Sequence, residues 1–458
     1  MAPMNPAPEP RSLPPLVMKF GGAALADGAG IRRVGAILAA RGGPRPVVVV
    51  SAAAGVTELL LQVAQAAVEG RSELDRIRIR HRTLLSQCGL EQELLNRLLV
   101  EMASVLEGIR ARNQISAAER DFVLSFGERM SARVVAAALR AGGSAATPVD
   151  AFDLGLLSDS NHGCAKPLPG NSAAIRRALR DVPGIPVVTG FVAKDTAGNL
   201  TTLGRNGSDL SASLLAEACG AHEVQFWKVV GGVMSADPTI VPEARGIDRL
   251  SYGEAAEYAF RGANVLHPLA LEPLERAGIP ARVLCLSEPD APGTWIGPGA
   301  SVARDPEATR AVGVTARRSL TLAHVELGAL EHRAQRSSEF FARLAHANIE
   351  PLWFSSGPSE LTVACGWSDE LAGMFALQGQ AIRIERSLAL VALAGPNSTE
   401  VESARVSLGS ARIDVRAQWS ESGRGSALFA VAEADLPAAV RAIHAAVFEA
   451  RVPDASSL

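Results

Sequence analysis

The chain has 458 residues, of which 48% are hydrophobic and 20% are charged, with 45 Lys and Arg against 48 Asp and Glu. This length predicts about three domains with cores of their own, and the composition excludes a disordered chain. A formal net charge of −3 provides no broad basic surface, so we expect no nucleic acid as a partner. No apolar run approaches the roughly 18 residues of a membrane-spanning helix, so we expect a soluble protein without a membrane partner.

The N-terminal residues and the cysteines bear on location and metal binding. Residues 1–15 contain six prolines and have the order of neither a signal peptide nor a transit peptide, which predicts a disordered tail on a cytoplasmic protein. The five cysteines are scattered and form no CxxC pair, so they support neither a disulfide framework nor a zinc site. We interpret them as small buried side chains and expect no protein-held metal.

Short apolar runs alternate with helical patterns in the first part of the chain. Leu16–Phe20 is expected as a strand ending at Gly21-Gly22, Ile31–Ala40 as the helix behind it, and Pro46–Val50 as a second strand. Continuous β-branched runs bounded by Gly and Pro suit strands buried on both faces. The pattern therefore predicts an α/β fold with a mainly parallel sheet between helices.

Further elements follow in chain order beyond residue 70. They are a helical hairpin over Glu73–Asn113, a strand, glycine turn and helix over Asp121–Leu139, strands at Ala146–Asp150 and Gly184–Phe191, a hairpin turn at Lys194–Asn199, and a helix over Leu210–Cys219 capped by Ser208 or Asp209.

The pattern of predicted elements changes after Glu288–Pro306, a segment rich in Pro and Gly, where we place a domain boundary. Beyond it, Leu320–Gly366 and Arg386–Ala434 each suggest strand, helix, strand, strand. Each is followed by an expected helix, Ser368–Leu377 and Leu436–Ala450. Two ferredoxin-like βαββαβ units fit this pattern.

Three short motifs carry possible chemistry. Lys19-Phe20-Gly21-Gly22 places a cation at a strand end before two residues without a Cβ, where backbone N–H groups can approach a phosphate. The loop 204–209 (GRNGSD) offers an Arg for a carboxylate at a helix start. The segment 127–131 (GERMS) offers a Glu that could hold an ammonium. Taken singly, the first motif is better explained as an ordinary strand-to-helix turn. The second is compatible with a capped helix and a solvated Arg, and the third is explained nearly as well by a Glu that complements the helix dipole.

Taken together and in order, these segments resemble the aspartate kinases of the amino-acid kinase family. The resemblance rests on VMKFGG (17–22), VVVVSAAAGVTELL (47–60), FVLSFGERMSARVVAAAL (122–139), PVVTGFVAKDTAGNLTTLGRNGSDLSAS (186–213), VGGVMSADPTIVPEA (230–244), SYGEAAEYAFRGANVLHP (251–268) and EPDAPGT (288–294). It implies a catalytic domain of the amino-acid-kinase fold over residues 16–300. It also implies two ferredoxin-like ACT regulatory domains, in the regions 301–385 and 386–458.

The resemblance also implies the reaction, which is transfer of the ATP γ-phosphoryl group to the side-chain carboxylate of L-aspartate in aspartate-family amino-acid biosynthesis. ATP would bind with Mg²⁺ held mainly by its phosphates, and ACT domains would pair two subunits into a homodimer or larger assembly. The implied catalytic residues are Lys19 and Asp209, the substrate-binding residues are Ser51, Thr57, Glu128, Arg205 and Ser208, and the nucleotide-binding residues are Lys19, Gly21, Gly22, Lys228, Val229, Met234, Thr239 and Asn264.

The sequence departs from the family pattern in the nucleotide region. Ala23 and Ala24 stand where relatives usually have hydroxyls, and Val229 replaces a carboxylate. Losing several polar contacts to ATP would weaken its binding by about tenfold or more. Two alternatives therefore stay open, a non-catalytic homologue that binds an amino acid as a regulatory subunit, and a kinase for a modified acidic amino acid. The turn that relatives use for a feedback amino acid is also altered here, at 350–360.

Overall fold

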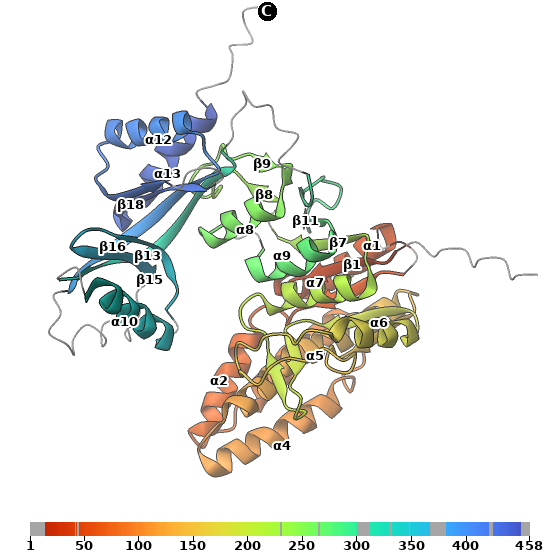
Figure 1. The fold of residues 1–458 in the computed structure, drawn as a ribbon. Helices are drawn as coiled ribbons and strands as arrows, with labels where there is room; N and C mark the ends of the chain where they lie inside the picture. The colour runs from red at the N-terminus through yellow and green to blue at the C-terminus, as the bar shows by residue number, and fades with distance from the viewer. Residues whose placement is uncertain are drawn as a thin grey trace, which may run out of the picture. The chain divides into compact units, whose positions relative to one another are not determined.

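The chain divides into two units in a computed structural model that describes residues 14–41, 43, 45–229, 231–263, 266–299, 311–328, 332–347, 349–366, 382–420 and 425–449. The first unit comprises Met1–Val233, Asp248–Tyr252 and Val265–Ser301, and the second comprises Met234–Ile247, Gly253–Asn264 and Val302–Leu458 (Figure 1). The catalytic domain predicted over residues 16–300 includes 234–247 and 253–264. They pack in the second unit instead, because Ala236 and Val241 lie in its core and Phe260 packs against it.

The first unit is built on an eight-stranded sheet in the order β10-β12-β11-β7-β1-β2-β4-β3. All neighbours run parallel except β11 and β12, which confirms the predicted mainly parallel sheet. The strands are β1 (Leu16–Phe20), β2 (Val47–Val50), β3 (Ala146–Val149), β4 (Ile185–Thr189), β7 (Glu223–Lys228), β10 (Arg249–Leu250), β11 (Ala281–Cys285) and β12 (Thr294–Ile296).

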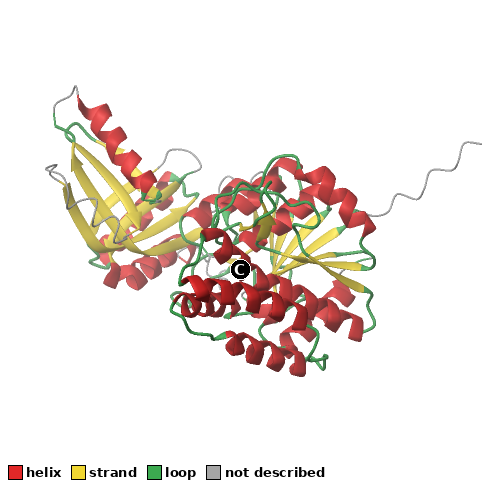
Figure 2. Cartoon of the chain, turned by 90° about the horizontal axis from the view of Figure 1, so that it is seen from below, coloured by secondary structure: helices red, strands yellow, loops and turns green. Residues whose placement is uncertain are grey.

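Helices cover both faces of this sheet, and Figure 2 shows the strands between two helical layers. Helices α1 (Gly28–Arg41), α2 (Val56–Val68) and α5 (Ala117–Ala141) pack on one side. The two helices expected over Glu73–Asn113 are present as α3 (Leu74–Gln87) and α4 (Asn96–Arg112), and each packs against α2. Helices α6 (Asn171–Asp181), α7 (Gly207–Cys219) and α9 (Pro268–Ala277) lie on the other side. The predicted hairpin turn at 194–199 joins β5 (Val192–Lys194) to β6 (Leu200–Thr202).

The strand predicted at the start of Asp121–Leu139 is wrong. These residues lie in one helix of 25 residues, α5, which begins at a capping box between Ser116 and Glu119. The helix is buried on nearly every side along much of its length, so it lacks the one-sided apolar stripe of a surface helix. Apolar runs of that kind cannot be distinguished from a buried strand by periodicity. Glu128 therefore lies within a helix and not at a strand-to-helix turn.

The predicted start and cap of α7 are also wrong. The helix begins at Gly207, three residues before Leu210, and its N-cap is Asn206 in a left-handed conformation with φ of 58°. Asn206 makes no side-chain capping hydrogen bond. Ser208 and Asp209 lie inside the first turn with buried side chains, so they are free of the capping role and face the interior.

The second unit contains one continuous antiparallel sheet of six strands, in the order β14-β15-β13-β16-β18-β17. The two predicted strand sets are therefore joined, through β13 (Gly313–Glu326) and β16 (Ile382–Ala394). Its other elements are α8 (Tyr252–Phe260), α10 (Arg333–His346), β14 (Pro351–Ser356), β15 (Glu360–Gly366), α12 (Ser398–Ser410), β17 (Val415–Ser420), β18 (Ser426–Ala432) and α13 (Leu436–His444). The helix expected at 368–377 lies outside the described residues.

This sheet bends back on itself. The two long strands carry Ser319 and Ser387 with φ of 58° each, and their pairing shifts register between Arg317 and Leu322. The outermost strands, β14 and β17, meet through Trp353 and Trp419, whose ring centroids are 3.8 Å apart. The folded sheet encloses a core of its own between its two halves, formed by Leu320, Leu322, Leu352, Ala364, Leu388, Leu390, Ala392, Leu428 and Ala430. Helices α10, α12 and α13 pack on the opposite face.

Candidate active site

The two predicted catalytic residues of the first unit meet at the end of β1. Met18 and Phe20 point into the core shared with α1 and α5, so the alternation of a strand turns Lys19 toward α7. Its Nζ lies 2.5 Å from Oδ1 of Asp209 in the first turn of that helix. Lys19 is 8% exposed and Asp209 is 3% exposed. A buried ion pair therefore marks the carboxyl end of the central strand.

Glu128 approaches the same strand ends from α5. Its Oε1 accepts a hydrogen bond of 2.9 Å from the backbone N of Ala52, just after β2, while Oε2 is buried without a hydrogen-bond partner among the described residues. Burial raises the pKa of Glu128 to about 8, although the Ala52 N–H and the charge of Lys19 oppose this shift. One carboxylate oxygen is thus available to a cation that enters the site. Ala52 gave no signal in the sequence, because its contribution is a backbone group.

The loop before α7 and the first turn of this helix carry two more of the predicted substrate-binding residues, Arg205 and Ser208. Ser208 is buried against the end of β4, where a Cβ on Gly190 would lie only 2.5 Å from that of Ser208. Gly190 therefore permits the close approach of helix and strand. Arg205 is exposed on the loop, so its guanidinium is accessible to solvent and to a ligand.

Ser51 and Thr57 flank the turn after β2. Ser51 is half-buried, and its backbone N donates to the carbonyl of Phe20 over 3.2 Å, which joins the ends of β1 and β2. Thr57 is exposed in the first turn of α2. Gly21 and Gly22 continue β1 into a short 3₁₀ helix, Gly22–Leu25. Each of these predicted residues therefore lies at the carboxyl edge of β1 or β2.

A second lysine, Lys228, ends the neighbouring strand β7. Burial lowers its pKa, the charge of Lys19 lowers it further, and the charge of Asp209 raises it. Lys228 follows Trp227, which pairs with Phe20 on the neighbouring strand β1, so its backbone lies beside the end of β1 that carries Lys19. The adjoining Val229 is 59% exposed and helps to line a small cavity together with Ala23 and Ala24. The three positions that depart from the family pattern thus surround one space.

Three predicted nucleotide-binding residues are not among the described residues of the first unit. Met234 and Thr239 belong to the second unit, where the carbonyl of Met234 accepts from Tyr258 Oη over 2.7 Å. Thr239 donates from its N and Oγ1 to Asp237 over 2.9 and 2.7 Å. Asn264 lies outside the described residues.

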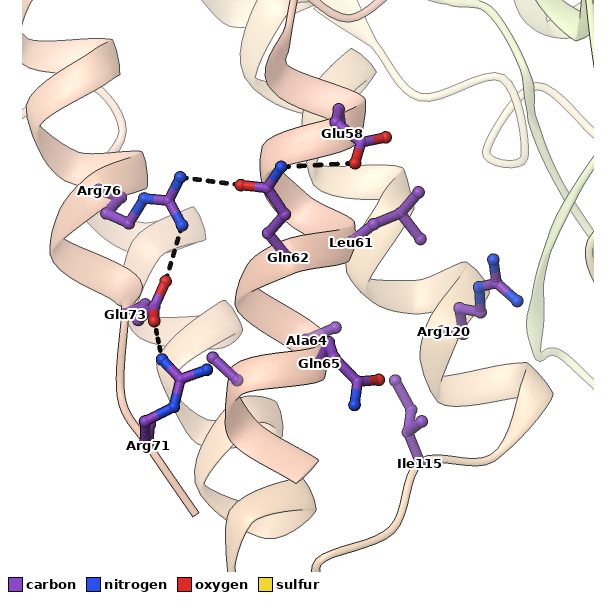
Figure 3. A pocket seen from close by; sticks show the side chains of 11 residues that line it. Glu58, Leu61, Gln62, Ala64, Gln65, Arg71, Glu73, Arg76, Ile115 and Arg120 are labelled. Atoms are coloured by element: carbon purple, nitrogen blue, oxygen red, sulfur yellow. Dashed lines mark hydrogen bonds and ion pairs between the residues drawn. The ribbon is translucent and has the colours of Figure 1, made fainter. Parts of the chain in front are cut away.

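A larger groove of about 620 Å³ lies among α2, the start of α3 and the start of α5 (Figure 3). Its rim includes Arg76, which donates to Glu73 over 2.7 Å and to Gln62 over 2.8 Å. None of the predicted site residues lines it.

Within the described residues there is no group of three or more His, Cys, Asp or Glu placed to hold a metal ion, and no helix is long and apolar enough to cross a membrane.

Comparison with known proteins identifies the family. Residues 14–285 match the sequence profile of the amino acid kinase family, which is more than half of the chain. The chain belongs to the amino acid kinase family. Among relatives of this amino acid kinase, the chloroplastic aspartokinase 2 of Arabidopsis thaliana is 36% identical over 292 residues, which cover 61% of this chain and 54% of that protein. The chain thus spans about half the length of the Arabidopsis relatives that it matches.

Other relatives of this amino acid kinase extend the match toward the C-terminus. The lysine-sensitive aspartokinase 3 of Escherichia coli is 32% identical over 400 residues, covering 83% of this chain and 87% of that protein. A crystal structure of E. coli aspartokinase III, solved in complex with aspartate and ADP, superposes with a TM-score of 0.79 at 29% identity and covers 94% of this chain and 99% of that one. The fold predicted from the resemblance, a kinase domain followed by ACT regulatory domains, is confirmed.

Proposed function

We propose that this protein is an aspartate kinase, which transfers the γ-phosphoryl group of ATP to the side-chain carboxylate of L-aspartate and forms 4-phospho-L-aspartate. The observation that carries the proposal is the convergence of Lys19, Asp209 and Glu128 at the carboxyl edge of the parallel sheet. Ligands of open α/β sheets bind at this edge. The E. coli relative, whose whole length the chain matches, was solved with aspartate and ADP, which supports both substrates.

The amino acid would be held by groups of opposite charge. Glu128, with one buried oxygen available, pairs with the substrate ammonium, and the exposed Arg205 can bind the α-carboxylate with two parallel hydrogen bonds. Hydroxyls of Ser51, Thr57 and Ser208 complete the set of polar contacts. These contacts leave the side-chain carboxylate of aspartate to act as the nucleophile.

The transfer needs no general base, because an ionised carboxylate attacks directly. A carboxylate oxygen of aspartate forms a bond to the γ-phosphorus, the bond from that phosphorus to the bridging oxygen breaks, and ADP leaves with the electron pair. Lys19 and the backbone N–H groups of Gly21 and Gly22 stabilise charge on the transferred group, and Asp209 holds the Lys19 ammonium in place. Catalysis then consists of positioning and charge stabilisation.

The nucleotide would lie beside β1 and β7. Lys19 and Lys228 supply two cations near one carboxylate, and backbone N–H groups follow β1, which is a donor set suited to polyphosphate. Mg²⁺ commonly binds through substrate phosphates and one or two carboxylates, and the described residues offer no protein cage for it, so its ligands would be mainly phosphate oxygens. Val229, Met234, Thr239 and Asn264 remain proposed nucleotide contacts.

Trapping the product with hydroxylamine tests this function. Purified protein with MgATP, aspartate and hydroxylamine should form aspartyl hydroxamate, and omission of either substrate should abolish it. The same assay with glutamate or substituted aspartates in place of aspartate identifies the phosphoryl acceptor. It thereby tests the alternative that the acceptor is a modified acidic amino acid. No hydroxamate from any acceptor or nucleotide would refute a kinase function.

A second candidate, a regulatory homologue without kinase activity, is favoured by one observation. Ala23, Ala24 and Val229 line a single cavity and contribute no polar side chain to it. Calorimetry separates the two candidates, since tight MgATP binding by the isolated protein would exclude the second one.

We also propose that two subunits form a homodimer through their ACT domains, and that the protein is cytoplasmic. Light scattering of the full chain tests the homodimer.

A further inference from the structure

Asp121 is a buried carboxylate that the proposed chemistry does not use. It is 1% exposed and accepts four hydrogen bonds. Its Oδ2 accepts from the backbone N of Thr202 at 3.0 Å, the backbone N of Gly163 at 2.9 Å and Nδ1 of His162 at 3.1 Å, while Oδ1 accepts from Thr202 Oγ1 at 2.8 Å. A desolvated carboxylate needs such a set of donors, and here both of its oxygens accept hydrogen bonds.

Two of the four bonds, both donated by Thr202, connect the two elements that carry the proposed amino-acid contacts. Asp121 precedes Glu128 by seven residues on α5, so both side chains leave the same face of the helix, about 10 Å apart along its axis. Thr202 is the last residue of β6, and the chain reaches Arg205 three residues later. One side chain thus sets the start of the Arg205 loop relative to the helix that holds Glu128.

The segment around His162 and Gly163 supports the same loop from its other side. The backbone N of Ala165 donates to the carbonyl of Thr202 over 2.9 Å. Gly204, with φ of 73°, lies so close that a Cβ on it would be 3.3 Å from Sγ of Cys164. The loop at Gly204 is therefore held between β6 and this segment, and Asp121 binds both of them.

We infer that Asp121 is a positioning residue for the amino-acid substrate, which fixes the Arg205 loop relative to Glu128 so that one aspartate molecule can reach both. This inference rests on the proposed function. Misplacement of a binding group by about 1 Å can cost a hundredfold in rate, so the geometry between these two groups matters. Replacing Asp121 should weaken the binding of aspartate and not that of ATP. The proposed ATP contacts Lys19 and Lys228 lie on β1 and β7, and Asp121 makes no hydrogen bond to either strand.

A purely structural role for Asp121 makes a different prediction, and the chain contains a matched control. Asp195, at the opposite end of the same β5–β6 hairpin, is 3% exposed and also accepts four hydrogen bonds. Its donors are Ala197, Asn199 and Ser160, and none of them lies on α5. Replacing either Asp removes one buried carboxylate that hydrogen-bonds to the hairpin, but only Asp121 connects the hairpin to α5, the helix that carries Glu128.

The experiment compares Asp121→Asn, Thr202→Val and Asp195→Asn in the full chain, with steady-state kinetics and with calorimetry of aspartate binding. For Asp121→Asn we expect the KM and Kd for aspartate to rise 10- to 100-fold, while the KM for MgATP changes less than twofold. Thr202→Val removes a single donor with little change in shape, so a rise of a few fold in the same direction is expected. Asp195→Asn should lower the unfolding temperature but leave both KM values within twofold.

Several outcomes would overturn the inference. They are an unchanged aspartate KM and Kd in folded Asp121→Asn and Thr202→Val, an equal rise in both KM values, or an equal aspartate effect in Asp195→Asn. If Asp121→Asn does not fold, Thr202→Val decides alone. Wild-type protein that makes no acyl phosphate but binds aspartate would refute the proposed activity, and the Kd values would still decide the role of Asp121. Wild-type protein that neither binds nor phosphorylates aspartate refutes both.

Discussion

Nζ of Lys19 lies 2.5 Å from Oδ1 of Asp209, and both side chains are at least nine-tenths buried. Neither charge is tolerated easily in that position without the other, because each has lost most of its hydration. The pair is therefore a structural element of the first unit as well as the proposed centre of phosphoryl transfer.

Breaking this pair should damage stability and activity together. Lys19→Met leaves the Asp209 carboxylate buried without its cation, so we expect a loss of about 3 kcal/mol in unfolding free energy and no detectable transfer. The double variant Lys19→Met/Asp209→Leu should be less destabilised than the sum of the single changes, since neither charge of the pair is left without its partner. Urea unfolding followed by circular dichroism measures both effects.

The control for this prediction is an exposed ion pair between α9 and α7, the helix that carries Asp209. Arg276 pairs with Glu217 of α7 over 2.7 Å, but the Arg276 side chain is 60% exposed. Arg276→Met should cost less than about 1 kcal/mol and leave transfer intact, as is usual for surface pairs. Equal losses for Arg276→Met and Lys19→Met would contradict the view that burial makes the pair important.

Aspartate use should increase with pH through the titration of Glu128. Burial raises its pKa to about 8, and only the ionised carboxylate can pair with the substrate ammonium. In wild-type protein kcat/KM for aspartate should therefore rise between pH 6.5 and about 8. Glu128→Gln should show a much lower kcat/KM without this rise, whereas a rise that persists in Glu128→Gln would assign the titration to another group.

The same shift makes a stability prediction whose sign can be worked out. The pKa of Glu128 is raised in the folded protein from its usual 4.5, so the folded state holds the proton over a pH range in which the unfolded chain releases it. The contribution of Glu128 to stability is fully present below about pH 4.5 and is lost as pH rises toward 8. In thermal unfolding, the unfolding temperature of Glu128→Gln minus that of wild type should increase by several degrees between pH 5 and pH 8. A constant difference would show that the Glu128 carboxyl is not protonated in the fold.

The strands and the site motifs were predictable from the sequence to different degrees. The run of valines at 47–50 and the turn residues at 194–199 specify local structure, and both predictions hold. Helix α5 was mistaken at its start because it is buried almost all round, although the pair Ser116 and Glu119 was an available helix-start signal. The bonding of Glu128 to Ala52 is invisible in a sequence, because the donor is a backbone group brought in by tertiary structure.

Adding a hydroxyl beside the small cavity should improve nucleotide use. Ala23 is exposed in the turn after β1 and lines that cavity. A neutral hydrogen bond contributes about 0.5–1.5 kcal/mol, so Ala23→Thr should lower the KM for ATP by about two- to tenfold and leave that for aspartate unchanged. Ala39→Thr, on an exposed position of α1, should change neither KM. An unaltered ATP KM in Ala23→Thr would place the nucleotide away from this cavity.

The contact between Trp353 and Trp419 should stabilise the folded sheet of the second unit. Their strands are the two edges of the sheet, so the rings close its interior over the leucines of both halves. Both rings are partly buried, and we expect either Trp→Ala change to lower the unfolding free energy by about 2 kcal/mol, less than for a fully buried aromatic. Near-UV circular dichroism should also lose signal from the ring pair.

A double-mutant cycle tests whether the two edges depend on each other. Once Trp353 is replaced, Trp419 has lost its partner, so the double variant should be less destabilised than the sum by about 0.5–1.5 kcal/mol. Phe354, the next residue on β14, is 55% exposed and points away from the enclosed core, so Phe354→Ala should cost less than either Trp change. Additive losses in the Trp353/Trp419 cycle would mean that each ring stabilises only its own half of the sheet, and that the bends at Ser319 and Ser387 alone bring the edges together.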